Sequence, residues 1–560
     1  MTGRISRRTL ARRALAVTLA LEMTRGLKPP AAGAAGGSET RIQLLSINDF
    51  HGGIEERTVS GRPVGGAAAL AAHLALRRAG RANSLTVHAG DLIGASPPIS
   101  ALARDEPSIT SMDLLGVQLG SAGNHEFDRG AAELLRLQYG GCDAAMNCFG
   151  GSRMQYLAAN VVDRVTGRPI LSPYMVRSID DVRIGFIGLT LRETPTIVRP
   201  SGVAGLDFLD EVATINRYAG ELQAQGVNAI VGLIHQGGDG SVDGGPITGA
   251  EINRIANGID PAVRVIVSGH THRGYQGYIG DKLVTQAFSY GTALADHEIV
   301  VDRQSGRIVG ATAAVITTFL DDLVLDPAIV AQVQVWQDEV RPLVERLVGE
   351  AAIDITRESS AAGESALGNL IADAHRAAMG TQIAFTNPGG IRDDLPAGPI
   401  TWGRLFAIQP FANDLVRMTL TGVQIERLLN QQWQDENFIR ILKTSGVHYV
   451  WDGDNPSQRV RLADVFLADG TPVRPDERYT VAVNSYLATG GDGFMVLTEG
   501  DDRETGPVDL DALVSYIESL RQPIRARIEG RIEQRRVPLA MALLSATLWE
   551  SQGHARSCCT

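Results

Sequence analysis

The chain has few cysteines, no long apolar run and no excess of basic charge, and each absence narrows what it can do. Four cysteines occur in 560 residues, and none forms the Cys-x-x-Cys pair typical of thiolate metal sites. No stretch of 18 or more apolar residues is present, which predicts that there is no ordinary membrane span. The net charge of −11 argues against binding of nucleic acid polymers, which relies on broad basic patches.

The length exceeds what one hydrophobic core supports, so we expect two domains with additional segments. Apolar residues make up 44% of the chain and charged residues 21%, which is typical of a folded soluble protein. A phosphate-bearing substrate would then be captured locally, by metal ions and a few arginines, rather than by a broadly basic surface.

The amino-terminal segment differs from the rest. Its first 28 residues carry seven basic side chains and one acidic side chain, so the remainder is six charges more negative than the whole. The Arg7-Arg8 pair precedes a short apolar run, Ala14 to Leu21, and then small residues. This order predicts an export signal over residues 1–40, with the arginine pair indicating the twin-arginine route, and a periplasmic or secreted protein. The alternative is a disordered basic start.

Two of the cysteines, Cys142 and Cys148, lie six residues apart in a glycine-rich stretch. In an oxidising compartment they could close a small disulfide, whereas in the cytosol they would be free thiols. The sequence leaves both alternatives open.

From Arg41 to about Phe319 the pattern repeats as strand, loop and helix. Short aliphatic segments predict strands, and amphipathic segments between them predict helices. The expected strands are Ile42–Ile47, Leu85–Val87, Val182–Gly188, Ala229–Ile234 and Val263–Val267, and the expected helices include Ala67–Arg78 and Glu211–Gln225. Such alternation is typical of a layered α/β domain.

Polar motifs follow these strands directly. Asp49, Asp91, His235 and His270 each come just after an apolar strand. Ligands collect outside the carboxyl ends of strands in open α/β sheets, so we expect these residues to converge on one edge.

The residue types in these motifs are those that divalent cations prefer. The predicted metal ligands are Asp49, His51, Asp91, Asn124, His235, His270 and His272. They supply three or four ligands to each of two ions, and Asp91 is the best candidate to bridge them. Without cysteine ligands, Zn, Mn, Co and Fe are all chemically possible. The remaining histidines outside the motifs are interpreted as structural: His73, His88, His297, His375, His448 and His554.

His125 is expected to act differently. It follows the ligand Asn124 and precedes Asp128 by three residues, the spacing of neighbours on one helical face. A carboxylate partner would hold its tautomer and keep it cationic beside phosphate. We therefore predict that His125 and Asp128 are catalytic, either stabilising transition-state charge or protonating the leaving oxygen. The alternative is that Asp128 only caps the next helix.

The second half of the chain is expected to form a separate domain. Residues 326–350 predict a linking helix with one apolar face, formed by Ile329, Val333, Trp336, Val340, Leu343 and Leu347. A second domain should follow over 351–535, and residues 536–560 form a tail too short in its apolar part to span a bilayer.

Motifs in both halves resemble one family. Asn48-Asp49-Phe50-His51-Gly52, Gly90-Asp91, Gly123-Asn124-His125-Glu126 and Gly269-His270-Thr271-His272 resemble the calcineurin-like metallophosphatase domain of the 5′-nucleotidases. Gly368–Ala374, Asn387–Arg392, Pro410-Phe411 and Asn484–Phe494 resemble the nucleotide-binding domain of the same family. The resemblance implies a four-layer αββα sandwich over residues 41–325 and a smaller α+β nucleotide-binding domain over 351–535.

The resemblance also implies substrate-binding residues. Phe411 and Tyr486 would sandwich the base, Asn387 and Arg392 would meet the nucleotide, and Asp492 the ribose. In the family this domain rotates to deliver the phosphate to the metals. Of the two arginines that often precede the Gly-Asn-Leu motif, Arg357 matches one, while Ala361 stands at the other position, which puts substrate range in question.

Together these expectations describe an exported phosphohydrolase that uses two divalent ions, Zn or Mn as leading candidates, to cleave nucleoside 5′-monophosphates with activated hydroxide. Hydrolysis of UDP-sugars or of 2′,3′-cyclic nucleotides, with 3′-nucleotidase action, is the alternative that the same site would serve. Thiosulfate-type ester hydrolysis fits less well, because the nucleotide clamp is intact. A non-catalytic binding protein would be expected to lack some ligands, and none is missing.

Overall fold

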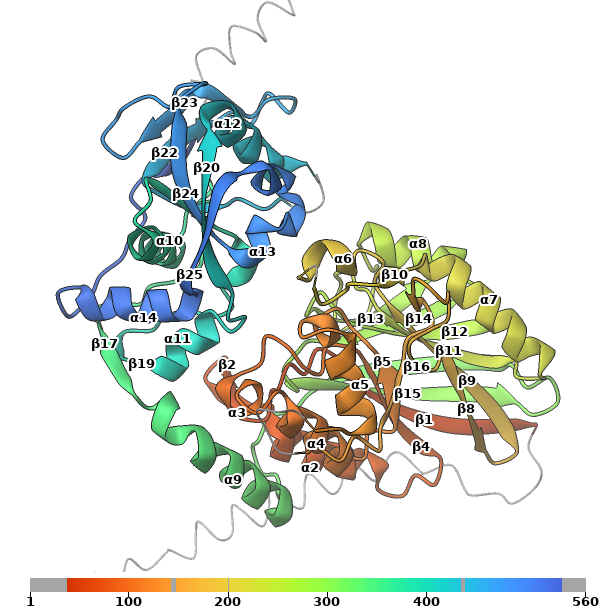
Figure 1. Cartoon of the computed structure of the whole chain (residues 1–560). Helices are drawn as coiled ribbons and strands as arrows, with labels where there is room; N and C mark the ends of the chain where they lie inside the picture. Colours follow the sequence, from red (N-terminus) through yellow and green to blue (C-terminus); the bar gives the residue numbers. More distant parts are fainter. Residues whose placement is uncertain (1–37, 143–147, 200, 435–438, 536–560) are drawn as a thin grey trace, which may run out of the picture.

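The computed structural model describes residues 38–142, 148–199, 201–434 and 439–535. The predicted export signal lies almost entirely outside these residues, as do His554 and the predicted tail. Figure 1 shows two lobes, with the amino-terminal half in red to green and the carboxyl-terminal half in green to blue. None of the helices in the described part of the chain has the length and apolar character needed to cross a membrane.

The amino-terminal lobe contains two six-stranded sheets. The first has the order β16-β15-β1-β4-β5-β6, in which β1, β4, β5 and β6 run parallel. Its strands are β16 (Ile308–Thr317), β15 (Ala293–Asp302), β1 (Glu39–Ile47), β4 (Ser84–Ala89), β5 (Leu119–Ser121) and β6 (Gln155–Leu157).

The second sheet has the order β13-β14-β12-β11-β9-β8, with a parallel centre and antiparallel edges. Its strands are β13 (Gly274–Ile279), β14 (Lys282–Ala287), β12 (Val263–Ser268), β11 (Ala229–His235), β9 (Val182–Thr190) and β8 (Tyr174–Ile179). The smaller elements of this lobe are β2 (Arg57–Val59), β3 (Arg62–Val64), α3 (Pro98–Ala101), β7 (Val161–Asp163), α6 (Thr194–Ile197) and β10 (Leu206–Phe208).

Three apolar cores show how these parts are layered. The first sheet packs on α2 (Gly66–Arg78), α4 (Glu106–Leu115) and α5 (Ala131–Tyr139). The second packs on α7 (Glu211–Ala224) and α8 (Ala250–Gly258). A third core, which includes Leu44 and Val231, lies between the two sheets. The predicted αββα sandwich is therefore confirmed. Each expected strand of this lobe falls within an observed strand, and the expected helices match α2 and α7, although α7 ends one residue earlier, at Ala224.

The linking helix is shorter than predicted. α9 spans Pro327–Val344, whereas the sequence indicated a helix over 326–350. Four residues of the predicted apolar face, Ile329, Val333, Trp336 and Val340, pack on the first core. Leu347 instead begins β17 (Leu347–Ala351), which pairs with β19 (Gly398–Thr401) and buries Val348 in the second lobe. The helix ends because the following residues pair as β17 with β19 of the next domain. Local sequence does not reveal such a pairing.

The carboxyl-terminal lobe is a smaller mixed domain. A five-stranded sheet, in the order β21-β18-β24-β20-β25, is accompanied by a three-stranded sheet, β23-β22-β26. The strands are β21 (Lys443–Ser445), β18 (Ile383–Thr386), β24 (Arg478–Asn484), β20 (Asp414–Thr421), β25 (Asp501–Val508), β23 (Val460–Leu467), β22 (Val447–Trp451) and β26 (Ile532–Gln534). The helices are α10 (Ala366–Met379), α11 (Trp402–Ile408), α12 (Gly422–Asn430), α13 (Ser485–Ala488) and α14 (Asp509–Ser519).

Candidate active site

The predicted metal ligands meet at the carboxyl ends of strands from both sheets. Asp49 follows β1, Asp91 follows β4, and His235 is the last residue of β11. Five of the seven have a left-handed backbone, which L-residues adopt at some energetic cost and mainly at functional sites. They are Asp49 (φ 49°), His51 (φ 45°), Asp91 (φ 52°), His270 (φ 77°) and His272 (φ 56°).

One group of donor atoms comes from Asp49, His51 and His272. The Nε2 atoms of His51 and His272 lie 3.1 Å apart, and His272 Nε2 is 3.4 Å from Asp49 Oδ1. The donor atoms of the group all lie within 4.8 Å of one another. His51 Nδ1 lies 2.8 Å from the carbonyl oxygen of Gly94. Because a carbonyl only accepts, the proton sits on Nδ1, and the Nε2 lone pair faces the group.

A second group comes from Asp91, His235 and His270, with Asn124 beside it. Asn124 Oδ1 lies 3.2 Å from His235 Nε2 and 3.0 Å from His270 Nδ1. His235 Nδ1 is 2.7 Å from the carbonyl oxygen of Ala89, which again directs the Nε2 lone pair into the group.

Asp91 lies between the two groups. Its Oδ2 is 3.1 Å from His235 Nε2 and 3.7 Å from His51 Nε2. Burial alone would raise the pKa of Asp91, but His235 and the neighbouring histidines hold it well below its usual value. An ionised carboxylate with nitrogen and oxygen donors on both sides is a donor set suited to divalent cations.

A buried carboxylate that the sequence analysis did not single out supports this arrangement. Glu126 is 1% exposed. Its Oε2 accepts hydrogen bonds from the backbone N–H groups of Asp91 (2.9 Å) and Gly123, and its Oε1 from that of Leu92 (2.8 Å) and from the Tyr156 hydroxyl (3.1 Å). Burial, together with Asp91, raises the pKa of Glu126 to about 7. Glu126 thus ties the loop of Asp91 to the loop of Asn124.

Glycine is required where these two loops meet. A Cβ on Gly123 would lie 2.1 Å from Asp91 Oδ1, closer than nonbonded atoms approach. The glycine of the Gly-Asn-His-Glu motif therefore leaves room for the Asp91 carboxylate.

His125 pairs with Asp128 as predicted, at 2.7 Å from Nδ1 to Oδ2. Burial lowers the pKa of His125, but the carboxylates of Asp128 and Asp91 outweigh it and raise the pKa above its usual value. Asp128 occupies Nδ1, so the other nitrogen of the ring is left for the cavity.

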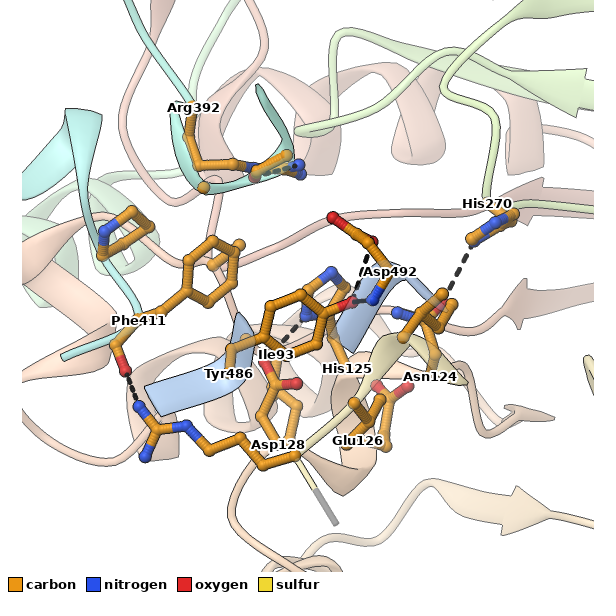
Figure 2. Close-up of a pocket in the computed structure, with 18 of the residues that line it drawn as sticks. Ile93, Asn124, His125, Glu126, Asp128, His270, Arg392, Phe411, Tyr486 and Asp492 are labelled. Atoms are coloured by element: carbon orange, nitrogen blue, oxygen red, sulfur yellow. Dashed lines mark hydrogen bonds and ion pairs between the residues drawn. The ribbon is translucent and has the colours of Figure 1, made fainter. Parts of the chain in front are cut away.

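A cavity of about 1230 Å³ lies between the two domains. It is lined from the amino-terminal side by Asn124, His125, Asp128 and His270. Its wall on the carboxyl-terminal side includes five predicted substrate residues, Asn387, Arg392, Phe411, Tyr486 and Asp492. Figure 2 shows the labelled residues of the two walls around one space, among them His125, Asp128, Arg392, Phe411, Tyr486 and Asp492.

The substrate-side residues form a hydrogen-bonded cluster. Asp492 Oδ1 accepts from the Tyr486 hydroxyl (2.8 Å), and its Oδ2 accepts from Asn387 Nδ2 (3.0 Å). Asn484 donates to Asn387 Oδ1 at 3.1 Å. These contacts set the orientation of the Tyr486 ring and of the Asp492 carboxylate.

Arg357 does not line the cavity. Its Nη1 donates to the carbonyl oxygens of Ile391 (3.2 Å) and Arg392 (2.9 Å). The prediction that it meets substrate therefore differs from the structure, in which Arg357 supports the loop that carries Arg392.

The other histidines and the cysteine pair lie outside this cluster of donor atoms. His88, His297 and His375 are fully buried, and burial lowers the pKa of His88 to about 3. His73 contacts the Phe319 carbonyl, and His448 stacks on Phe466. Cys142 and Cys148 are joined by a disulfide.

Comparison with known proteins agrees with this architecture. Residues 42–274 match the calcineurin-like phosphoesterase family, and residues 346–499 match the 5′-nucleotidase C-terminal domain. The crystal structure of a 5′-nucleotidase precursor from Thermus thermophilus is 31% identical, with a TM-score of 0.76 over 89% of this chain and 100% of that one.

Two relatives have a higher sequence identity to this chain than the Thermus protein has. The cell wall protein Lmo0130 of Listeria monocytogenes is 34% identical over 92% of this chain and 72% of its own length. Endonuclease YhcR of Bacillus subtilis is 36% identical over 88% of this chain, but the chain spans only 41% of YhcR. The chain therefore belongs to the 5′-nucleotidase family and is a metal-dependent phosphoesterase, with a calcineurin-like domain followed by a 5′-nucleotidase C-terminal domain.

Proposed function

We propose that this enzyme hydrolyses nucleoside 5′-monophosphates to nucleoside and phosphate. The observation that carries the proposal is the shared cavity, in which donor groups for cations and an aromatic, hydrogen-bonding wall face the same space. A mononucleotide presents a phosphate at one end and a base at the other, which matches these two kinds of wall. We assign catalysis to residues 41–325 and base recognition to residues 351–535.

Two divalent cations, Zn or Mn as leading candidates, fit the donor set. Asp49, His51 and His272 would hold one, Asn124, His235 and His270 the other, and Asp91 would bridge them. When bound, such ions polarise the phosphate and activate a water molecule for attack.

The protein's own side chains would then act on the phosphate and its leaving oxygen. His125, with Nδ1 engaged by Asp128, would present its other ring nitrogen to the phosphate. There it would stabilise developing negative charge or protonate the leaving oxygen. Arg392 would add a second cationic group on the opposite wall.

The nucleoside would be held by the carboxyl-terminal wall. Phe411 and Tyr486 offer ring faces to a base, and stacking of this kind contributes about 1–3 kcal/mol per base. Asp492 presents carboxylate oxygens that suit ribose hydroxyls, and Asn387 holds it in place.

We also propose that the protein is exported. The disulfide of Cys142 and Cys148 suits an oxidising compartment, and the basic, then apolar, composition of residues 1–40 suits an export signal. The similarity to a cell wall protein of Listeria points the same way.

Cleavage of a phosphodiester bond or of the diphosphate bond of a UDP-sugar is the second candidate. Two observations favour it: the cavity volume of about 1230 Å³ exceeds the roughly 300–1,000 Å³ of most small-molecule sites, and YhcR is named an endonuclease. The substrates would be UDP-sugars or 2′,3′-cyclic nucleotides. A nucleic acid strand, by analogy with YhcR, would have to bind against the net charge of −11.

The test is a substrate panel. Phosphate release would be measured from AMP and UMP, product formation from UDP-glucose and 2′,3′-cyclic AMP, and cleavage from single-stranded DNA, all with metal-loaded protein. Turnover of the monophosphates with kcat/KM well above that of the diesters is the expected result. Preference for any diester would move the assignment to the second candidate.

A further inference from the structure

One segment of the amino-terminal domain contacts the carboxyl-terminal domain at two aromatic residues of the cavity, Phe411 and Tyr486. This segment contains α6 and ends at Arg199. The Arg199 Nη2 donates to the carbonyl oxygen of Phe411 at 2.7 Å and to Asn413 Oδ1 at 3.0 Å. The Tyr486 hydroxyl lies 3.4 Å from the carbonyl oxygen of Thr196. The dashed line below Phe411 in Figure 2 marks the first of these contacts.

The segment is anchored in its own domain. Val198 is 3% exposed and belongs to the core of the first sheet. Thr194 is fully buried, and its hydroxyl donates to the carbonyl oxygen of Leu191. Arg199 therefore extends from a rigid base, so its guanidinium can fix the position of whatever it binds.

The receiving loop is held in a specific conformation. Ala412, between the two residues that Arg199 contacts, has a φ of 49°, which is unfavourable for alanine and persists only where surrounding contacts impose it. Asn413 is 4% exposed, and its carbonyl oxygen accepts from the backbone N–H of Asp509 at the start of α14. The loop is thus held between α14 and Arg199, with Phe411 at its edge.

Arg199 binds the carboxyl-terminal domain through hydrogen bonds rather than through an ion pair. Within the described parts of the chain, no carboxylate forms a salt bridge with it, and both of its hydrogen bonds go to neutral oxygens of the other domain. Hydrogen bonds from a charged donor are stronger than those between neutral groups, so two of them can bias the position of one loop.

We infer that Arg199 is a positioning residue for nucleoside recognition: through its hydrogen bonds to the 411–413 loop it holds Phe411 beside His125. This inference rests on the proposed function. It makes selectivity for nucleosides depend on a residue of the metal-binding domain that itself also lines the cavity.

The experiment compares Arg199→Gln with wild type on two substrates, AMP and p-nitrophenyl phosphate, which has no base. The matched control is Arg183→Gln, because Arg183 also donates to a backbone carbonyl, that of Gln225, but within its own domain. We expect KM for AMP and the Kd for adenosine to rise about 10-fold in Arg199→Gln, with kinetics on p-nitrophenyl phosphate unchanged. Arg183→Gln should behave as wild type.

A double-mutant cycle isolates the mechanism. In a Phe411→Ala background, Arg199→Gln should weaken adenosine binding by less than about 2-fold, because the ring that Arg199 positions is gone. An equal 10-fold loss in both backgrounds would overturn the inference, as would equal losses on AMP and p-nitrophenyl phosphate or no loss on either. Arg199→Lys, which keeps the positive charge but only one donor nitrogen, should give an effect between those of wild type and Arg199→Gln.

The two proposals fail in different ways. If wild type turns over p-nitrophenyl phosphate but neither hydrolyses AMP nor binds adenosine, the proposed function is wrong, and the role of Arg199 is overturned with it. If wild type hydrolyses AMP and Arg199→Gln does so with the same KM, only the role of Arg199 is overturned.

Discussion

The ring of Phe411 stacks on the ring of His125, with centroids 5.9 Å apart and planes inclined by 13°, although the residues belong to different domains. A predicted base-binding residue and a predicted catalytic residue are thus in contact. The proposed nucleoside site and the proposed phosphate site are therefore neighbouring parts of one cavity. This relationship makes specific predictions about each part.

Replacing Phe411 by alanine should weaken nucleoside recognition without damaging the chemistry. Loss of about 1–3 kcal/mol of stacking would raise KM for AMP roughly 5- to 150-fold. Phe411→Tyr, which keeps the ring, is the matched control and should stay close to wild type. An unchanged KM in steady-state kinetics of Phe411→Ala would contradict the assignment of this ring to base binding.

Replacing Asp128 by asparagine should affect the chemical step. Asn keeps a hydrogen-bond acceptor for His125 Nδ1 but removes the charge that favours the cationic ring. We expect kcat for AMP to fall by roughly 10²–10⁴-fold, with bound metal unchanged. Asp243→Asn, on an exposed loop, serves as control. Wild-type kcat in Asp128→Asn would show that the pair has only a structural role.

Glu126→Gln should lower the affinity of the site for metal ions, although Glu126 itself is not a predicted ligand. The carboxylate accepts four hydrogen bonds, and the amide group of Gln would turn a donor toward some of these N–H and O–H groups. Supporting residues of this kind typically change metal affinity by about 10–100-fold. Competition with a chelator would measure the affinity, beside Glu345→Gln on the exposed end of α9. Equal metal affinities in Glu126→Gln and wild type would show that Glu126 does not support the metal site.

Asp509 should make stability depend on pH. It is 2% exposed, and burial raises its pKa from 3.8 to about 7, against smaller opposing effects from Asn413 and Arg199. Because the folded pKa lies above the unfolded one, the stability contribution of the neutral carboxyl is fully present below about pH 4. It is lost as the pH rises through about 7.

Asp509→Asn cannot ionise, so it should gain stability relative to wild type as the pH rises. Between pH 5 and pH 8 the gain should be about 2–3 kcal/mol. Urea unfolding of both proteins at the two pH values would measure it. A difference that does not change with pH would show that Asp509 is not the group responsible.

Much of this architecture could be predicted from the sequence, because the informative signals are local. Aliphatic runs followed at once by Asp49, Asp91 and His235 predicted both the strands and the edge at which they end. The pairing of His125 with Asp128 was predicted because both lie on one short turn.

The features that were not predicted depend on contacts between distant segments. Glu126 was seen as part of a motif, but its partners, Leu92 and Tyr156, lie far from it in sequence. Arg357 was expected to contact substrate, whereas the fold directs it to the back of the 387–392 loop. Arg199 had no motif at all, since its partners belong to the other domain. The end of α9 was set by strand pairing of β17.

We propose that Asp91 joins two cation sites into one hydrolytic centre. The most direct measurement is metal content and phosphate release from AMP for wild type and Asp91→Asn, prepared and loaded identically. We predict about two ions per wild-type chain, fewer in the variant, and a loss of activity of about 10³-fold, as expected when several kcal/mol of charge stabilisation disappear. A variant that keeps both ions and wild-type phosphate release would contradict the account.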